Sequence, residues 1–189
     1  MKTRSILLVL ALGLILFSSC SKINDALTVK VPVDFTNDLQ VKSSTPGLKS
    51  SSGDYAFGGT STFNPSTDPT VIKYKAKIKN ITASGISYTP SGLPGDVTIT
   101  ESSLMIGNRT IENPNGKMVV WNLNSLTLKN GVLVDLPIPD EGTFADISTT
   151  LDGDGTVSVT WIGTQSSAID PYHFDVTIHA DVTAYLLKQ

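Results

Sequence analysis

The longest regular pattern in this sequence lies at its carboxyl end, over residues 172–187. Every second side chain is apolar there: Phe174, Val176, Ile178, Ala180, Val182, Ala184 and Leu186. The positions between them, from Asp175 to Tyr185, are mainly polar. A period of two is typical of a β-strand with one buried and one solvent-facing side. A strand of this length requires a neighbouring sheet and a second layer over its apolar face, which the rest of the chain has to supply.

Shorter segments with the same period precede it. Residues 28–35 predict a first strand, which residues 39–41 extend in one interpretation; Pro32 has no N–H to donate, so it indicates an edge strand or a nitrogen that faces outward. Residues 97–106 change phase between Ile99 and Leu104, and a bulge near 101–103 reconciles the two halves. Further strands are predicted over 118–128 and 156–162, between turns rich in Gly, Asn and Pro.

Residues 69–79 fit a helix and a strand equally well. A helical stripe and an alternating lysine pattern overlap there: Val71, Tyr74, Ile78 and Ile81 for the helix, and Lys73, Lys75, Lys77 and Lys79 for the strand. Asp68 followed by Pro69 favours a helix start, so we expect a short helix to about residue 76 and then a strand to residue 88. Thr143 is expected to cap a second short helix over residues 144–151.

These elements predict a mainly β chain with eight to ten strands and one or two short helices. The expected fold is an antiparallel two-sheet β-sandwich, Ig-like or jelly-roll-like. Charged residues make up 16% of the 189 residues, well below the usual quarter, and Thr, Ser and Val recur throughout. The length suits one domain, which we expect to span residues 28–189.

The amino terminus has the pattern of an export signal. Lys2 and Arg4 precede an apolar run over residues 6–17, which is too short to span a bilayer comfortably. The run ends in Phe17, Ser18, Ser19 and Cys20, and Cys20 is the sole cysteine of the chain. An ordinary signal peptidase site with an incidental cysteine would predict a secreted or periplasmic protein instead.

This ending resembles the lipobox of bacterial lipoproteins, although Phe17 stands where Leu is commoner. The resemblance implies cleavage by signal peptidase II after residue 19 and attachment of diacylglycerol and a further acyl chain to Cys20. Residues 20–27 would then form a lipid-anchored tether. Ser21 in place of Asp implies the outer membrane, and the few acids in residues 21–25 leave the periplasmic face and the cell surface both open.

The net charge and the distribution of Lys and Arg exclude some classes of binding partner. The formal net charge of −3 provides no basic face for nucleic acid. The predicted folded part shows no Lys/Arg cluster that indicates binding to anionic lipid. The expected partners are therefore the membrane, through the lipid anchor, and an envelope protein or glycan.

No nucleophile, metal or nucleotide motif is present, so we expect a protein without catalysis or cofactor. Asp152 and Asp154 resemble part of a calcium loop but are also ordinary turn residues. Four residues on the polar side of the last strand are a candidate metal site or a solvated face: His173, Asp175, His179 and Asp181. Tyr185 is the candidate for an exposed, ligand-stacking ring, whereas Trp121 and Trp161 are expected in the core.

Three functions remain open at this point. The first is a non-catalytic envelope lipoprotein that binds or supports a partner. The second is a glycan-binding module, which requires several exposed aromatic rings in one plane. The third is a glycan hydrolase, which requires two carboxylates facing each other across a cleft.

Overall fold

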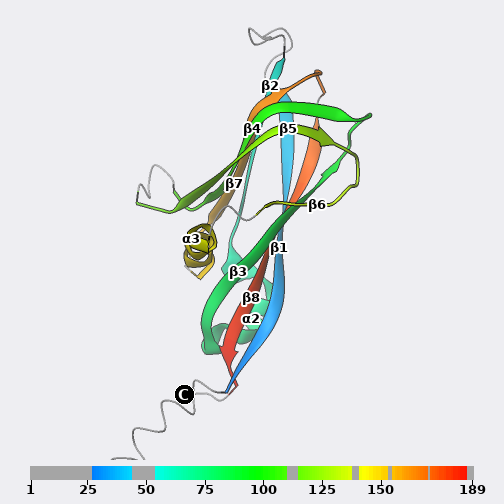
Figure 1. Cartoon of the computed structure of the whole chain (residues 1–189). Helices are drawn as coiled ribbons and strands as arrows, with labels where there is room; N and C mark the ends of the chain where they lie inside the picture. The colour runs from blue at the N-terminus through cyan, green and yellow to red at the C-terminus, as the bar shows by residue number, and fades with distance from the viewer. Residues whose placement is uncertain are drawn as a thin grey trace, which may run out of the picture.

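The chain forms an elongated, curled antiparallel sheet with few helices (Figure 1). This computed structural model describes residues 27–43, 54–109, 115–137, 141–152, 155–169 and 171–186. The strands are β1 (Thr28–Ser43), β2 (Tyr55–Phe63), β3 (Ile78–Ser91), β4 (Val97–Gly107), β5 (Met118–Leu128), β6 (Val134–Asp135), β7 (Val157–Gln165) and β8 (Tyr172–Tyr185). The order across the sheet is β5-β4-β7-β2-β1-β8-β3-β6. The predicted mainly β, antiparallel character is confirmed.

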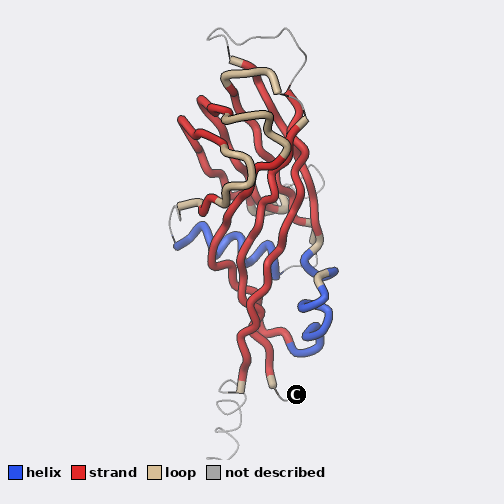
Figure 2. The backbone as a smooth tube through the Cα atoms, turned by 90° about the vertical axis from the view of Figure 1, so that its right-hand side faces the viewer, coloured by secondary structure: helices blue, strands red, loops and turns tan. Residues whose placement is uncertain are grey.

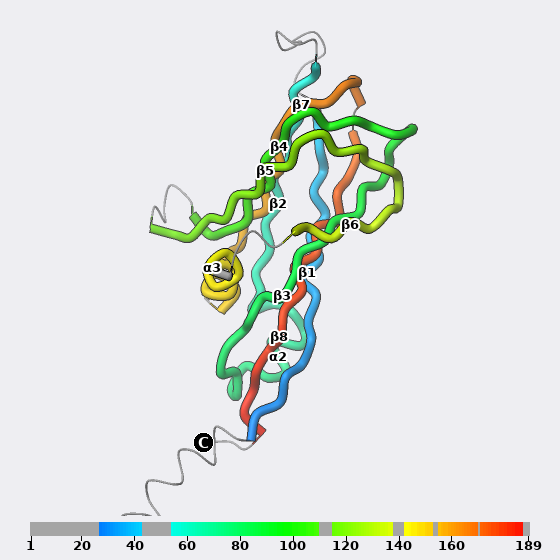
Figure 3. The backbone as a smooth tube through the Cα atoms, viewed as in Figure 1, coloured from blue at the N-terminus to red at the C-terminus, as the bar shows by residue number. Residues whose placement is uncertain are grey.

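The strand predicted at the carboxyl end is the centre of one half of the sheet. β8 pairs with β1 from Thr28–Tyr185 at one end to Val41–Tyr172 at the other, and it pairs with β3 on its opposite side. Figure 3 shows β1 and β8 running side by side along the length of the molecule. The even-numbered apolar side chains of β8 are buried, as the period of two predicts. We call β1, β8, β3 and β6 the β8 half.

The other half of the sheet consists of β2, β7, β4 and β5, and we call it the β7 half. The two halves are joined where Lys42 and Ser43, at the end of β1, pair with Gly58 and Phe57 of β2. Before that point β1 has a strand partner on one side only, which suits Pro32 because that residue has no N–H for a second ladder.

The apolar sides of both halves contribute to one hydrophobic core. Its largest fully buried side chains include Trp161, Tyr172, Phe174, Leu39, Ile86, Leu104 and Ile178. Trp161 of β7 stacks on Phe174 of β8, with ring centroids 4.0 Å apart and planes 19° apart. Tyr88 of β3 meets the Trp161 ring edge-on at 4.9 Å. The aromatic cluster therefore ties the β7 half to the β8 half.

The helices are short and lie on either side of the strands (Figure 2). η1 (Pro65–Thr67), α2 (Pro69–Tyr74) and η2 (Lys75–Lys77) follow one another between β2 and β3. The Asp68 carboxylate accepts hydrogen bonds from the N–H groups of Thr70 and Val71, which caps α2 as the Asp-Pro pair predicts. Residues 69–79 are thus helical to residue 77, and the strand begins at Ile78.

α3 (Glu141–Asp152) packs against β3 and buries Ile147 and Leu151. The Ala83 N–H donates a hydrogen bond to Ser148 Oγ, beside the register shift between Ala83 and Gly85. The expectation that Thr143 caps this helix is wrong, because the helix already begins at Glu141. Among the described residues, no helix has the length and hydropathy needed to span a bilayer.

The phase change predicted in residues 97–106 has the expected cause. The register of β4 against β7 shifts between Ile99 and Glu101, so Thr100 is an extra residue. Ile99 points into the core before the shift, and Ser102 and Leu104 do so after it. The bulge lies at the near edge of the predicted position, and it also shapes the surface described next.

Candidate functional site

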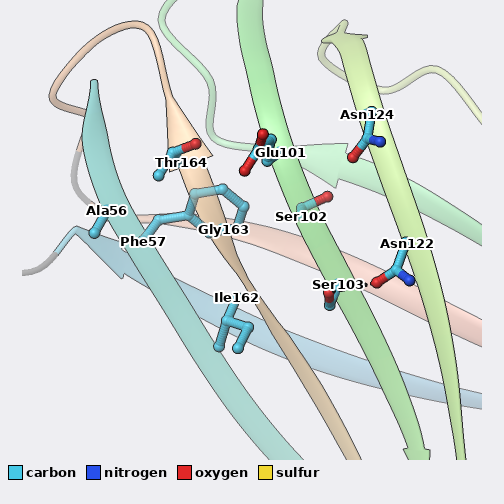
Figure 4. A pocket seen from close by; sticks show the side chains of 10 residues that line it. All are labelled: Ala56, Phe57, Glu101, Ser102, Ser103, Asn122, Asn124, Ile162, Gly163 and Thr164. Atoms are coloured by element: carbon cyan, nitrogen blue, oxygen red, sulfur yellow. Dashed lines mark hydrogen bonds between the residues drawn. The ribbon is translucent and has the colours of Figure 1, made fainter. Parts of the chain in front are cut away.

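An open groove of about 660 Å³ lies on the outer surface of the β7 half (Figure 4). Its lining residues come from all four strands: Ala56, Phe57, Glu101, Ser102, Ser103, Asn122, Asn124, Ile162, Gly163 and Thr164. The strand register arranges the outward positions in two rows. The first row contains Asn124, Glu101, Thr164 and Ala56, and the second contains Asn122, Ser103, Ile162 and Gly58.

Close approach of β7 and β4 forms the floor of the groove. A Cβ atom on Gly163 would come within 2.7 Å of Ser102 Cβ and would collide with the carbonyl oxygen of Glu101. Only glycine fits at this position without moving one of the two strands. The bulge between Ile99 and Glu101 lies next to it and places Glu101 on the outer side.

The groove contains neutral hydrogen-bonding groups and one carboxylate. Ser103 Oγ donates a hydrogen bond to Asn122 Oδ1 at 2.9 Å, and Asn124 and Glu101 are exposed beside this pair. Ile162, 46% exposed, adds an apolar contact. Hydroxyl and amide groups both donate and accept hydrogen bonds, so this surface suits an uncharged polar ligand better than an anion.

A second polar surface covers the outer side of β1, β8 and β3. His179 Nδ1 lies 2.7 Å from Asp34 Oδ1, and His179 Nε2 lies 3.0 Å from Ser87 Oγ. Further along β8, His173 Nδ1 lies 2.8 Å from Asp38 Oδ1. Each histidine of the predicted polar side therefore pairs with an aspartate of β1 across the strand boundary.

The hydrogen-bond distances in the row Ser87–His179–Asp34 match those of a nucleophilic triad, but the serine is buried and the aspartate is exposed, which is the reverse of a triad. In such a triad the serine faces the substrate and the carboxylate is shielded. Here Ser87 is 1% exposed, whereas the Asp34 side chain is 64% exposed. A substrate in solvent cannot reach Ser87 Oγ in this arrangement. The row is thus a chain of hydrogen bonds that links β3, β8 and β1.

The four residues proposed as a metal site do not converge. Asp175 pairs in register with Asp38 and Thr89, and Asp181 pairs with Pro32 and Thr82, so each aspartate lies two residues along β8 from a histidine and opposite no second metal ligand set. No group of three or more His, Cys, Asp or Glu side chains within the described ranges could hold a metal ion.

Asp152 and Tyr185, the other predicted site residues within the described ranges, do not line the groove. Asp152 is exposed at the end of α3, and Asp154 and Cys20 lie outside the described residues. Tyr185 is half-buried at the end of β8, and the Lys79 ammonium lies 5.8 Å from the centre of its ring.

Both tryptophans are in the core, as expected. Trp161 is fully buried, and Trp121 is 4% exposed with its indole N–H donating to the Pro137 carbonyl at 3.1 Å. Tyr88 and Tyr172 are buried as well. The three half-buried tyrosines lie on separate elements: Tyr55 on β2, Tyr74 on α2 and Tyr185 on β8.

Burial changes the acid–base behaviour of two tyrosines. Burial raises the pKa of Tyr172 far above its usual value of 10, and it raises that of Tyr88 as well. The Tyr172 hydroxyl donates a hydrogen bond to Gln165 Oε1 at 2.8 Å, and Gln165 Nε2 donates to the Ser167 carbonyl. The neutral phenol is therefore the form that this buried site favours.

Sequence reasoning did not identify the groove or the aspartate partners of the histidines. The alternation in each strand assigns Asp34, Asn122 and Ser103 to outer surfaces. It does not show which strands are neighbours or in which register they pair. These sites exist only because residues about 20 to 145 positions apart meet across the sheet.

Comparison with known proteins provides no family for this chain. No protein-family model matches it, and no curated protein matches it. Among solved structures, it is similar to a chain of Turnip yellow mosaic virus, with 10% identity, 86% of this chain and 84% of that chain covered, and a TM-score of 0.36. A chain of Mud crab tombus-like virus has 10% identity, 86% and 91% covered, and a TM-score of 0.36. Such low TM-scores support no conclusion about fold or function.

Proposed function

We propose that this chain is a non-catalytic lipoprotein of the bacterial cell envelope whose folded body is a binding module. The observation that carries the proposal is the position of the groove relative to the start of the fold. Phe57, which lines the groove, pairs with Ser43 at the end of β1, whereas Thr28 begins the same strand. A strand of 16 residues spans roughly 50 Å. A lipid on Cys20, eight residues before Thr28, would leave the groove near the end of β1 that is farther from the membrane.

The arrangement of polar groups supports binding rather than catalysis. Ser87, the serine beside a histidine–aspartate pair, is buried beneath that pair. Glu101 is the one carboxylate among the described residues that line the groove, whereas glycoside hydrolysis by the usual mechanism needs two facing carboxylates. Purified protein that turns over a glycan or an ester would contradict this part of the proposal.

A glycan is the second candidate ligand, and the lining of the groove favours it over a charged ligand. Side chains of Asn122, Asn124, Ser103 and Thr164 offer the donors and acceptors that sugar hydroxyl groups need. Among the described residues that line this surface, the sole aromatic ring is that of Phe57, which is 4% exposed. Binding would then depend on hydrogen bonds rather than on stacking.

The proposed cellular site is the outer membrane, with Cys20 as the lipid attachment point. The residues that support it are Ser18, Ser19 and Cys20 at the end of the apolar run, followed by Ser21. For the finer architecture, we propose a two-sheet β-sandwich of Ig-like or jelly-roll-like type. The packing of Trp161 against Phe174 across the two halves supports a sandwich.

Lipidation is tested on the protein recovered from its own cells. Mass spectrometry of the amino terminus should find Cys20 as the first residue, carrying diacylglycerol and a further acyl chain. The Cys20→Ser variant should lose incorporation of labelled palmitate and should leave the membrane fraction or remain uncleaved. An unmodified thiol on Cys20 in the mature protein would overturn the anchoring proposal.

Binding in the groove is tested with a blocking substitution and a matched control. Asn124→Arg places a long cation in the groove, whereas Thr62→Arg makes the same change at an exposed position of β2 outside it. Partners captured from cross-linked envelopes, and binding to envelope glycans, should be lost in the first variant and kept in the second. Equal capture by both variants would show that the groove is not the binding surface.

A further inference from the structure

One end of the molecule is rich in lysines. It consists of residues 27–30, 69–80 and 183–186, which are the start of β1, the segment from α2 into β3 and the end of β8. We call it the lysine-rich tip. It contains five lysines and no Asp or Glu: Lys30, Lys73, Lys75, Lys77 and Lys79. The whole chain has a formal net charge of −3, so its charge is strongly uneven.

The fold brings these three segments together. Ile78 and Val29 both pair in register with Ala184, one on each side of β8. Lys77 Nζ donates a hydrogen bond to the Leu186 carbonyl at 3.4 Å, and Lys79 lies over the Tyr185 ring. Figures 1 and 3 show the first residues of β1 and the last residues of β8 together at one end of the molecule, with α2 in the same half. The alternating lysines therefore do not line one side of a strand, and the fold gathers them into a cluster that the sequence pattern alone did not indicate.

Exposed apolar side chains belong to the same three segments as the lysines. Leu27 is 37% exposed, Ile72 57% and Leu186 52%, and they are three of the eight large hydrophobic side chains exposed in the described part of the chain. Tyr74 and Tyr185 are half-buried beside them. Lysines, exposed aliphatic side chains and tyrosines together are typical of surfaces that lie in the headgroup region of a bilayer.

We propose that the lysine-rich tip is a docking surface for a bilayer that contains anionic lipids. The ammonium groups would contact lipid phosphates while Leu27, Ile72 and Leu186 enter the interface. A bilayer fits better than a compact partner because the charges lie around the tip instead of converging in one pocket. Acids among the described residues lie close to the tip and weaken its field: Asp68 precedes α2, Asp152 lines one pocket with Lys75 and Lys79, and Asp181 pairs with Pro32.

The position of the tip also agrees with the proposed anchor, and this step rests on the proposed function. Cys20 precedes Leu27 by seven residues, which can span at most roughly 25 Å. A lipid on Cys20 would keep the tip within that distance of the bilayer. The lipid and the lysines would then act as two membrane signals, and the second would orient the body. The charge and exposure of the tip itself do not depend on the lipid.

The test is surface labelling of the full protein mixed with vesicles of phosphatidylcholine alone or with phosphatidylglycerol. Acylation of Lys73 and Lys75 should fall several-fold on the anionic vesicles, while acylation of Lys117 and Lys129 stays unchanged. High salt should restore the labelling, because it screens the attraction. Equal labelling of Lys73 and Lys75 on both vesicles would overturn the proposal, as would equal protection by inorganic phosphate without vesicles.

Charge variants separate docking from general adhesion. Each lysine removed should lower the affinity for an anionic surface roughly fivefold. The variant with Lys73→Gln, Lys75→Gln, Lys77→Gln and Lys79→Gln should lose the protection of Ile72 and Leu186 from hydroxyl radicals on anionic vesicles. The control with Lys117→Gln and Lys129→Gln should keep it. Circular dichroism confirms that both variants are folded, and retained protection in the fourfold variant would contradict a role for these lysines.

The test also separates this inference from the proposed anchor. Mass spectrometry of the same preparation reports whether Cys20 carries lipid. An unmodified Cys20 with composition-dependent protection of Lys73 would remove the anchor and keep the docking surface. A lipidated Cys20 with equal labelling on both kinds of vesicle would keep the anchor and remove the docking surface.

Discussion

Trp161 stacks on Phe174 with ring centroids 4.0 Å apart, and this contact joins the two halves of the sheet. β7 and β8 are not neighbours in the strand order, because β2 and β1 lie between them. The contact therefore closes the curled sheet over its own apolar side. Both rings are fully buried, so the packing of either half depends on the other.

Truncation of this contact should destabilise the whole body. We expect Phe174→Ala to lower the free energy of unfolding by about 3–5 kcal/mol, because it leaves a cavity between the halves. Urea denaturation followed by the fluorescence of Trp161 and Trp121 measures it. Ile162→Ala, at a position 46% exposed, should cost well under about 1 kcal/mol. A similar loss in both variants would show that the cluster does not join the halves.

Gly163 should not tolerate even one extra methyl group. Gly163→Ala would bring a Cβ atom against Ser102 and the Glu101 carbonyl, so we expect a loss of about 1–3 kcal/mol as β7 and β4 move apart. Gly95→Ala is the control, since a Cβ there meets no atom within 4 Å. Thermal unfolding of the two variants checks the difference. An unchanged midpoint for Gly163→Ala would contradict the close strand approach.

Tyr172 should make the fold sensitive to alkali. Burial raises its pKa in the folded state, so above about pH 10 the unfolded chain loses this proton first. Stability should be unaffected below that pH and should fall above it by up to about 1.4 kcal/mol per pH unit from this residue. Tyr172→Phe should abolish the part of this pH dependence that comes from Tyr172. Urea denaturation at a series of pH values from 7 to 11 measures the free energy of unfolding of both proteins.

At neutral pH the same variant should be less stable than the wild type. Tyr172→Phe leaves Gln165 Oε1 buried without its donor, which should cost about 1–3 kcal/mol. The gap between variant and wild type should therefore narrow as the pH rises above 10. Phe57→Leu, which removes no titrating group, should lower the curve by a constant amount. A Tyr172→Phe curve that is merely parallel to that of the wild type would refute the argument.

Asn37 should be replaceable by an apolar residue with a gain in stability. It lies on the core side of β1 between Phe35 and Leu39, and its Nδ2 is buried without a hydrogen-bond partner among the described residues. Its Oδ1 accepts from Ser61 Oγ at 2.8 Å. Replacing both partners, Asn37→Leu with Ser61→Ala, should raise the free energy of unfolding by about 1 kcal/mol.

The single variant Asn37→Leu is the control for this pair. It should gain less than the double variant, because Ser61 then has no acceptor for its hydroxyl. Urea titrations of both variants and the wild type provide the comparison. A double variant less stable than the wild type would contradict the prediction, because it would show that the buried Asn37 amide stabilises the fold.

Alternation along the chain was sufficient to locate β8, β1 and the bulge in β4. Each is a local consequence of side chains that must face either the core or solvent. The helix start at Asp68 was predictable for the same reason, since a carboxylate followed by proline satisfies the first N–H groups of a helix. The start of α3 was missed, because the cap was expected at Thr143 and the helix begins two residues earlier, at Glu141.

The sequence by itself determined the β character of the chain, the buried positions of its tryptophans and the signal-like amino terminus. Tertiary structure alone decided that Asp34 meets His179, that four strands form the polar groove, and that Lys77 and Lys79 meet Leu186 and Tyr185 at the end of β8. The physical reason is that side-chain direction in a strand alternates from one residue to the next, so it can be inferred from a short stretch of sequence. Strand order and register depend on contacts between residues far apart in the chain, which no local pattern contains.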